Sequence, residues 1–382
     1  MITILLIGLY QTGRRDTRRF ARAVVLHDVG FVDAKFSVGK AKVVAAAGAR
    51  QDRFAHRSWA RQRECRPSSA PTYDERSTVT YSLFARYRAY AQAALSLMIT
   101  VTSASGADVV AEPPAPEVMV FAVGDLAQCE NAAPNEAPTA RVARLVDGGS
   151  APILMVGDLA YPNGSEEDLS RCFAPLWGKF KGRMLPVPGN HEYHNPEAAP
   201  YYGYFGDQAG VAGQGYYAVH IGAWRVIGLN SNINVEAGSA QERWLKAELA
   251  VHSVRCTLAF WHHPRFSSGK HGDTPSMGII WRDLNDAGVD VVIAGHDHDY
   301  ERFAPQTASG ERDDKRGIRE FVVGTGGAAL RPFAQFKRNS EARSSNSFGV
   351  LKLTLREESY AWEFVPVDGS GIHDHGEAMC HE

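Results

Sequence analysis

The chain has 382 residues, of which 44% are hydrophobic and 22% are charged, so it can bury a sizeable core as one large domain or two smaller ones. Its formal net charge of -2 and its pI near 6.7 exclude a whole-protein electrostatic attraction to nucleic acid or to an anionic membrane. The sequence has no apolar run of the roughly 18 to 20 residues that a membrane-spanning helix needs. The five cysteines lack C-x-x-C spacing, which excludes a thioredoxin-like pair and a zinc site of that pattern.

The first 86 residues differ in composition from the rest. They carry 13 Arg and 3 Lys against 7 Asp plus Glu, a net charge of +9, which leaves -2 minus 9, or -11, for residues 87–382. Their apolar residues show no sustained helical or strand period, so we predict that 1–86 is a basic extension, disordered or not translated. The arginine clusters lack interleaved aromatic residues, and we therefore expect no nucleic-acid partner.

A segment similar to a signal peptide follows at 87–107. Arg86 and Arg88 precede an apolar stretch at 89–101, and Ser105-Gly106-Ala107 stands before Asp108. A positive flank, a short apolar segment and small residues at a cleavable site make up a secretory signal. Because such signals begin a protein, we interpret translation as starting in the 80s and the mature protein, secreted or extracytoplasmic, as starting near 108. The alternative is a buried helix behind a basic extension.

After a Pro-rich linker at 108–116, short apolar runs alternate with helical patterns. These patterns predict buried strands at 118–123, 153–156, 184–187, 257–261 and 289–294, and helices at 139–147, 166–180, 239–252 and 278–287. A hairpin is predicted from 216–220 and 224–230, and two late runs, 348–355 and 360–365, indicate further antiparallel strands. The alternation predicts a layered α/β domain at 117–370, followed by a C-terminal tail at 371–382. We expect that tail to be flexible and acidic, and the histidines in it not to form a metal tract.

Five of the predicted strands end in residues able to bind metals. The ends are Gly124-Asp125, Gly157-Asp158 with Tyr161, Gly189-Asn190-His191-Glu192, Trp261-His262-His263-Pro264 and Gly295-His296-Asp297-His298. Ligands bind beyond the carboxyl ends of strands in open α/β sheets, so we expect these loops to converge on one site. A single Gly-Asp pair is common in turns. Five successive strands that all end in such residues favour a metal site. Carboxylate, carboxamide and imidazole without thiolate suit iron, manganese or zinc, and Asp158, central in the set, is the natural bridge between two ions.

The ordered set resembles the calcineurin-like metallophosphoesterase superfamily and, within it, the purple acid phosphatases. The family motifs match from Asp125 to His298. The first superfamily motif usually carries a His where this chain has Ala127, and purple acid phosphatases instead supply a Tyr three residues after the bridging Asp, where this chain has Tyr161. Ala127 also departs from the Gly usual in purple acid phosphatases. The resemblance implies a four-layer α/β/β/α sandwich.

The resemblance also implies two metal ions, Fe(III) with Zn, Mn or Fe(II). One ion would be bound by Asp125, Asp158, Tyr161 and His298, and the other by Asp158, Asn190, His262 and His296. The family ligand stands two residues before the Pro, so His262 is preferred to His263. His191 and His271 stand where the family keeps histidines that touch the phosphate and the leaving group. Two alternatives are that Tyr161 merely packs its ring and that His271 is an exposed loop histidine.

We therefore expect a secreted phosphatase that hydrolyses small phosphate monoesters by attack of metal-activated hydroxide. A metal-dependent phosphodiesterase on the same fold is one alternative. A non-catalytic secreted protein that binds phosphate or metal is another. If Cys65 is removed with the leader, four cysteines remain, and we predict the disulfides Cys129–Cys172 and Cys256–Cys380, since secretion favours disulfides.

Overall fold

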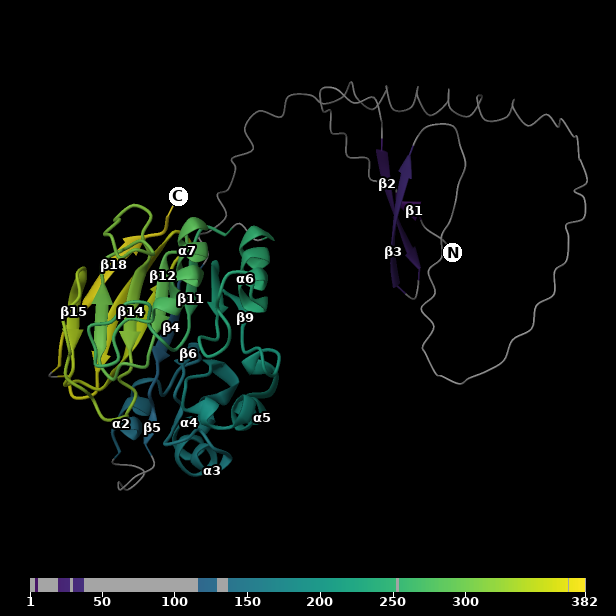
Figure 1. Cartoon of the computed structure of the whole chain (residues 1–382). Coiled ribbons are helices and arrows are strands. Elements are labelled where there is room, and N and C mark those ends of the chain that lie inside the picture. Colours follow the sequence, from purple (N-terminus) through teal and green to yellow (C-terminus); the bar gives the residue numbers. More distant parts are fainter. Residues whose placement is uncertain are drawn as a thin grey trace, which may run out of the picture. The chain divides into compact units, whose positions relative to one another are not determined.

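The computed structural model describes residues 4–5, 20–27, 30–37, 116–128, 137–251, 254–369 and 371–381. The chain divides into two units, Met1–Ser105 and Gly106–Glu382 (Figure 1). In the first unit, β1 (Ile4–Leu5), β2 (Phe20–His27) and β3 (Gly30–Ser37) form an antiparallel sheet. These strands lie within 1–86, and our prediction that this segment is a basic extension, disordered or not translated, stays a prediction. The predicted signal-like segment, 87–107, lies outside the described residues.

Six strands of the second unit form a mixed sheet in the order β18-β17-β16-β4-β6-β8. Its parallel strands are β4 (Val118–Val123), β6 (Ile153–Val156) and β8 (Met184–Val187). Antiparallel pairing adds β16 (Gly349–Leu355), β17 (Ser359–Pro366) and β18 (His375–Met379). The strands predicted at 118–123, 153–156 and 184–187 and the two late runs are confirmed.

Seven strands form the other sheet, in the order β15-β13-β14-β12-β11-β10-β9. The predicted hairpin is confirmed as β9 (Tyr217–Ile221) and β10 (Trp224–Gly228), and the next predicted strands as β11 (Thr257–Phe260) and β12 (Val291–Ala294). The strands β13 (Tyr300–Phe303), β14 (Arg319–Val323) and β15 (Ser340–Ser344) were not predicted. Beyond the ends of β4 and β6, β5 (Ala127–Gln128) pairs with β7 (Ala160–Tyr161).

The α-helices among the described residues are α2 (Pro138–Leu145), α3 (Glu166–Asp168), α4 (Ala174–Trp177), α5 (Ala199–Phe205), α6 (Ala240–Val251) and α7 (Gly278–Asp286). A continuous helix over 166–180 is wrong. The chain there passes through α3, a π-helical turn at Leu169–Phe173, α4 and a 3-10 segment at Gly178–Arg183. Pro175 lacks the N–H that a continuous α-helix would use at that position, which accounts for part of the break.

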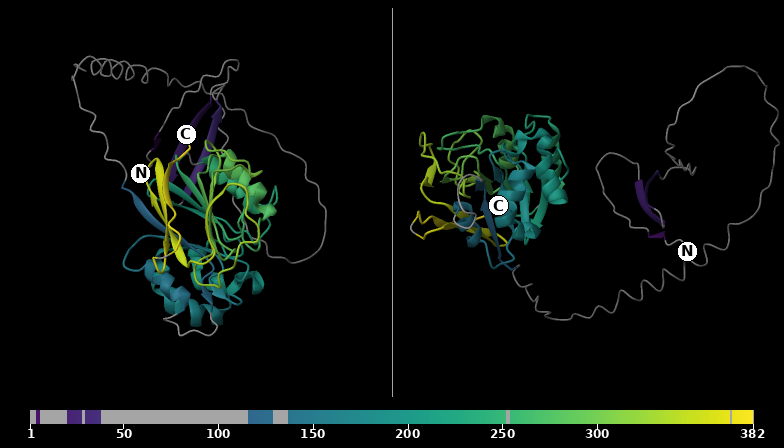
Figure 2. Two further views of the ribbon diagram at one scale, coloured as in Figure 1. Left: turned by 90° about the vertical axis from the view of Figure 1, so that its left-hand side faces the viewer. Right: turned by 90° about the horizontal axis from the view of Figure 1, so that it is seen from below.

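Three apolar clusters separate four layers. Successive residues of a strand face opposite sides of a sheet, so Leu154 and Val156 of β6 pack with Leu258 and Phe260 of β11 between the two sheets. The intervening Ile153 and Met155 pack against the helices outside the six-stranded sheet, among Val142, Phe173 and Trp177. Ala259 and Trp261 pack against α6 and α7, among Leu245, Trp281 and Leu284. Figures 1 and 2 show the same separation of α6 and α7 from α2–α5. The predicted four-layer α/β/β/α sandwich is confirmed.

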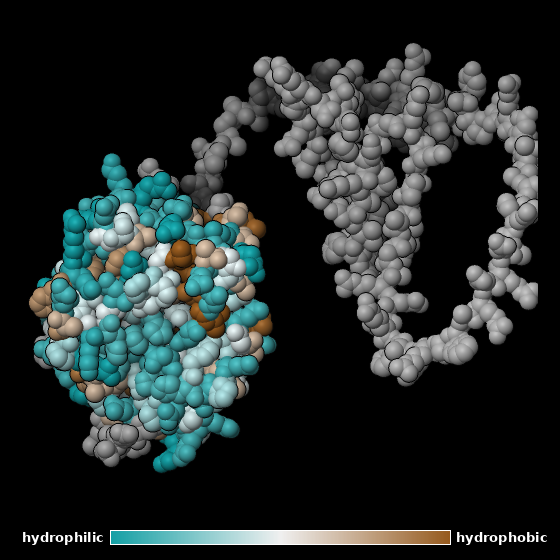
Figure 3. Space-filling model, in the orientation of Figure 1, coloured by the Kyte–Doolittle hydropathy of each residue, from teal (hydrophilic) through white to brown (hydrophobic). Residues whose placement is uncertain are grey.

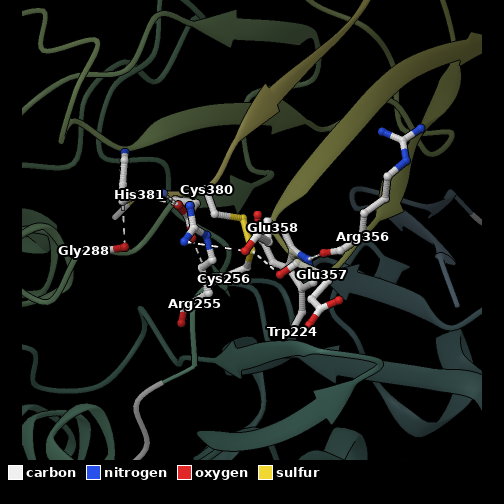
Figure 4. Close-up of a disulfide and its surroundings, with 11 residues drawn as sticks. Trp224, Arg255, Cys256, Gly288, Arg356, Glu357, Glu358, Cys380 and His381 are labelled. Carbon is white, nitrogen blue, oxygen red and sulfur yellow. Dashed lines mark hydrogen bonds and ion pairs between the residues drawn. A yellow bond between two sulfur atoms is a disulfide. The ribbon is translucent and has the colours of Figure 1, made fainter. Parts of the chain in front are cut away.

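The C-terminal segment is attached to the domain. β18 pairs with β17, and Cys380 forms a disulfide with Cys256, with their Cα atoms 5.4 Å apart (Figure 4). The His381 N–H donates a hydrogen bond to Asp290 Oδ1 at 2.7 Å. The Cys256–Cys380 prediction is confirmed, and the prediction of a flexible tail is wrong because strand pairing and the disulfide hold this segment. The Cys129–Cys172 pairing stays a prediction, since Cys129 lies outside the described residues.

The described surface is mainly polar on the face of the second unit that Figure 3 presents. Among the residues that the structure describes, no helix has the length and apolar character needed to cross a membrane.

Candidate metal centre

The candidate centre lies at the carboxyl ends of strands from both sheets. Asp125 and Asp158 follow the last residues of β4 and β6 by two positions, and Asn190 follows β8 by three. His262 and His296 follow β11 and β12 by two positions. Because β4, β6 and β8 belong to one sheet and β11 and β12 to the other, packing of the two sheets brings these side chains together.

The turns after the strands hold the backbone in an uncommon conformation. Asp125, Asp158 and His296 have φ angles of 57°, 51° and 70°, in the left-handed region that non-glycine residues seldom adopt. Such strain persists only where the surroundings fix it, and it is concentrated at functional sites. Close packing contributes at Gly189, where a Cβ would lie 2.1 Å from Asp158 Oδ1. Only glycine therefore fits there without moving the carboxylate.

The Tyr161 hydroxyl is the meeting point of one group of ligands. It lies 2.9 Å from Asp125 Oδ1, 3.1 Å from Asp158 Oδ2 and 3.1 Å from His298 Nε2. His298 Nε2 also lies 3.4 Å from Asp125 Oδ1. Asp125 is fully buried and Asp158 is 1% exposed. Four oxygen and nitrogen donors thus converge in a space shielded from solvent.

A second group meets at His262. Its Nε2 lies 3.3 Å from Asp158 Oδ2, 3.1 Å from Asn190 Oδ1 and 3.2 Å from His296 Nδ1. Asp158 Oδ2 therefore contacts both groups, through Tyr161 in the first and His262 in the second. The bridging role of Asp158 stays a prediction, and the contacts of this one oxygen with both groups support it.

Hydrogen bonds from the far ring nitrogens orient two of the histidines. His262 Nδ1 donates to the Val156 carbonyl at 2.8 Å, and His298 Nδ1 donates to the Ala329 carbonyl at 2.8 Å. Each bond leaves Nε2 directed at the centre. This arrangement is typical of metal-binding histidines, whose other nitrogen is held by a carbonyl or carboxylate.

Without a cation, protons must balance the charge of the buried carboxylates. Burial, together with Asp125 and Asp158, raises the pKa of Tyr161 well above its ordinary value. Burial alone would lower the pKa of His262, but the Asp158 carboxylate outweighs burial and raises that pKa to about 9. Burial also lowers the pKa of His296, with help from His262. The oxygen and nitrogen atoms that share protons here are the atoms that would bind a metal ion. Hard oxygen and imidazole ligands suit iron, manganese or zinc.

The two predicted catalytic histidines flank this centre. His191 Nδ1 contacts the Pro162 carbonyl, and its Nε2 lies 3.8 Å from Asp158 Oδ2. The exposed His271 has its ring centroid 4.3 Å from that of His296. His263, to which we preferred His262 as the metal ligand, forms a 2.9 Å hydrogen bond between its Nδ1 and Ser231 Oγ. Its ring centroid lies 4.4 Å from that of His296, and one ring nitrogen each of His262, His263 and His296 lie within 4.8 Å of one another.

Two buried acidic residues of the same motifs were not assigned a role from the sequence. Glu192 accepts hydrogen bonds from the backbone N–H groups of Asp158, Leu159 and Gly189 at 3.0, 2.9 and 2.7 Å. Asp297 accepts from the N–H groups of His271 and Gly272 at 2.7 and 3.1 Å. Their positions in the sequence carried a signal, since Glu192 stands two residues after Asn190 and Asp297 stands between His296 and His298. Both residues fix the loops that carry ligands.

The chain is similar to known phosphoesterases. A family model described as calcineurin-like phosphoesterase matches residues 108–300. Purple acid phosphatase 15 of Arabidopsis thaliana is 26% identical over 225 residues, covering 48% of this chain and 40% of that protein. Probable inactive purple acid phosphatase 27 of the same plant is 22% identical over 268 residues, covering 58% and 42%. The chain thus spans less than half the length of these two relatives.

A solved structure shows the same fold. The purple acid phosphatase PPD1 from yellow lupin (Lupinus luteus) seeds superposes with a TM-score of 0.58 at 18% identity, over 70% of this chain and 54% of that chain. The four layers, the donors at the strand ends and the matched family model agree with one another. The chain belongs to the calcineurin-like phosphoesterase family and is purple acid phosphatase-like within it.

Proposed function

We propose that this phosphoesterase is a secreted, binuclear metal-dependent phosphatase that hydrolyses phosphate monoesters. The observation that carries the proposal is the contact of one carboxylate oxygen, Asp158 Oδ2, with two groups of donors. Asp125, Tyr161 and His298 would hold one cation with Asp158. Asn190, His262 and His296 would hold the other with Asp158.

Two bound cations would polarise the phosphoryl group and lower the pKa of an attacking water. The protein's own part is to position the phosphate and assist the leaving group. In its protonated form, His191 can donate a hydrogen bond from Nε2 to a phosphoryl oxygen, because its Nδ1–H donates to the Pro162 carbonyl while its Nε2 faces the centre. His271 lies on the side of His296 and is suited to the leaving group.

Tyr161 supports ferric iron as one of the two cations. A phenolate is a hard anionic donor that matches Fe(III) better than zinc. The pKa of Tyr161 is raised by burial and by two carboxylates, so a strongly charged ion is needed to displace its proton. We propose Zn, Mn or Fe(II) as the second ion.

A disulfide and a signal-like segment support secretion. The Cys256–Cys380 disulfide is typical of oxidising compartments outside the cytosol. The apolar segment before Asp108 has the composition of a secretory signal.

The test is hydrolysis of an aryl phosphate monoester and of the matching diester by metal-loaded protein. We expect the monoester to have the larger kcat/KM, and Asp158→Asn to abolish turnover of both. His375→Ala, at an exposed residue of β18, is the control and should keep full activity. A larger kcat/KM for the diester would favour the phosphodiesterase alternative, and absence of turnover with both metals bound would favour a non-catalytic binding protein.

A further inference from the structure

Arg331 places a guanidinium group at the edge of the candidate centre. Its Nη1 contacts Nε2 of His271, whose ring in turn lies against His296, with centroids 4.3 Å apart. One imidazole ring therefore separates the Arg331 side chain from a proposed metal ligand. Arg331 was not among the candidates from the sequence, because it follows no predicted strand end and stands in a long loop.

The backbone that carries Arg331 is tied to the centre at three points. The Arg331 N–H donates to the His298 carbonyl at 3.0 Å, and the Ala329 carbonyl accepts from His298 Nδ1 at 2.8 Å. The Ala328 N–H donates to the Asp125 carbonyl at 2.9 Å. These hydrogen bonds hold residues 328–331 against the two proposed ligands Asp125 and His298. They therefore fix the backbone position from which the Arg331 side chain extends.

The charge of Arg331 is available for an anion. In the described part of the chain, the side-chain partner of Arg331 is His271 and no ion pair to a carboxylate is formed. Arg302 and Arg319 differ, since both pair with Glu341 and Arg302 also pairs with Asp374. Because a guanidinium can only donate, His271 Nε2 is the acceptor in this contact.

We propose that Arg331 is a substrate-binding residue that contacts a non-bridging phosphoryl oxygen and favours the dianionic monoester over the monoanionic diester. This inference rests on the proposed function. A guanidinium has five N–H donors in a fixed plane, so Arg331 can keep its contact with His271 and direct other donors at the phosphoryl group. A monoester offers one more negative oxygen than a diester, and charge-assisted hydrogen bonds to that oxygen are lost when it is esterified.

The test compares Arg331→Ala and Arg331→Lys with a control, Arg338→Ala, which removes an exposed arginine from the same loop. For each metal-loaded protein, kcat/KM is measured for p-nitrophenyl phosphate and bis(p-nitrophenyl) phosphate. The dissociation constant for inorganic phosphate is measured by titration calorimetry. Circular dichroism and metal content show that each variant is folded and loaded.

For Arg331→Ala we expect the phosphate dissociation constant to rise, and the monoester kcat/KM to fall, by roughly 10- to 100-fold. The diester kcat/KM should change by less than about threefold, because the lost contact belongs to the additional oxygen. Arg331→Lys should recover part of the phosphate affinity, and Arg338→Ala should match the wild type.

Equal losses for both esters would overturn the proposal, because they would mean that Arg331 only positions His271. An unchanged phosphate dissociation constant would also overturn it. If the wild type turns over neither ester, the proposed function fails, whereas the phosphate titration still decides whether Arg331 binds the anion.

Discussion

Asp158 Oδ2 lies 3.3 Å from His262 Nε2, so a carboxylate from the end of β6 meets an imidazole from the end of β11. The two strands belong to different sheets, and the apolar cluster between the sheets includes Val156 and Phe260, which stand near these two strand ends. The candidate centre therefore exists only when the sandwich is assembled. Ligand geometry and core packing depend on each other in this fold.

Tyr161→Phe tests the ferric site, because it removes the oxygen that lies between Asp125 and Asp158 and keeps the ring. If that oxygen is a phenolate ligand of Fe(III), the oxidised wild type should be coloured by charge transfer. The Phe variant should lose the visible band and keep its far-ultraviolet circular dichroism. A colourless wild type that is fully active with zinc or manganese alone would contradict the iron assignment and leave the two-metal proposal intact.

Glu192→Gln tests the buried carboxylate through the pH dependence of folding in metal-free protein. Burial, with a contribution from Asp158, raises the pKa of Glu192 from 4.5 to about 7. Between these values the folded state binds more protons than the unfolded state, so the contribution of Glu192 to the free energy of unfolding is present below pH 4.5 and lost as the pH rises through about 7.

The measurement is guanidinium denaturation of wild type and variant from pH 4.5 to 8. Across this window, the free energy of unfolding of the wild type should fall by roughly 2 to 3 kcal/mol more than that of the variant. Glu236→Gln, at an exposed glutamate, is the control and should follow the wild type. Parallel curves for wild type and Glu192→Gln would show that Glu192 keeps an ordinary pKa.

The Cys256–Cys380 disulfide should stabilise the domain by restricting the unfolded chain. The two cysteines are separated by 124 positions, and the loop-entropy model gives about 5 kcal/mol as an upper value for a loop of that length. Cys256→Ala with Cys380→Ala should lower the free energy of unfolding by roughly 2 to 5 kcal/mol. Reduction of the wild type should give the same loss, and a double variant as stable as the oxidised wild type would refute this role.

A chain that starts at Asp108 should fold and keep its activity, because Gly106–Glu382 is a unit with its own core. Thermal unfolding and phosphatase assays of this truncation check the point. A matched truncation that ends at residue 369 removes β18 and Cys380, and it should be less stable because it loses a paired strand and the disulfide. An insoluble Asp108 truncation would contradict the independence of this unit.

The sequence predicts the parts of the fold where burial is strong. Runs such as 153–156 are buried on both faces and read as strands, and the Gly-Asp and Gly-Asn turns after them mark the candidate ligands. Strands β13 and β15 escape prediction because half of the residues in YERF and two of the five in SEARS are charged, so no apolar run marks them and tertiary pairing decides their conformation. Arg331 and Asp297 escape because their roles depend on contacts between distant loops.

Metal stoichiometry measured together with activity tests the central claim most directly. Native mass spectrometry of the purified protein should find two metal ions per chain, and monoester hydrolysis should rise with occupancy of the second ion. Asp158→Asn should retain fewer ions and lose activity, since its carboxylate contacts both groups of donors. A fully active wild type with one ion or none, or an Asp158→Asn variant with two ions and full activity, would contradict the binuclear account.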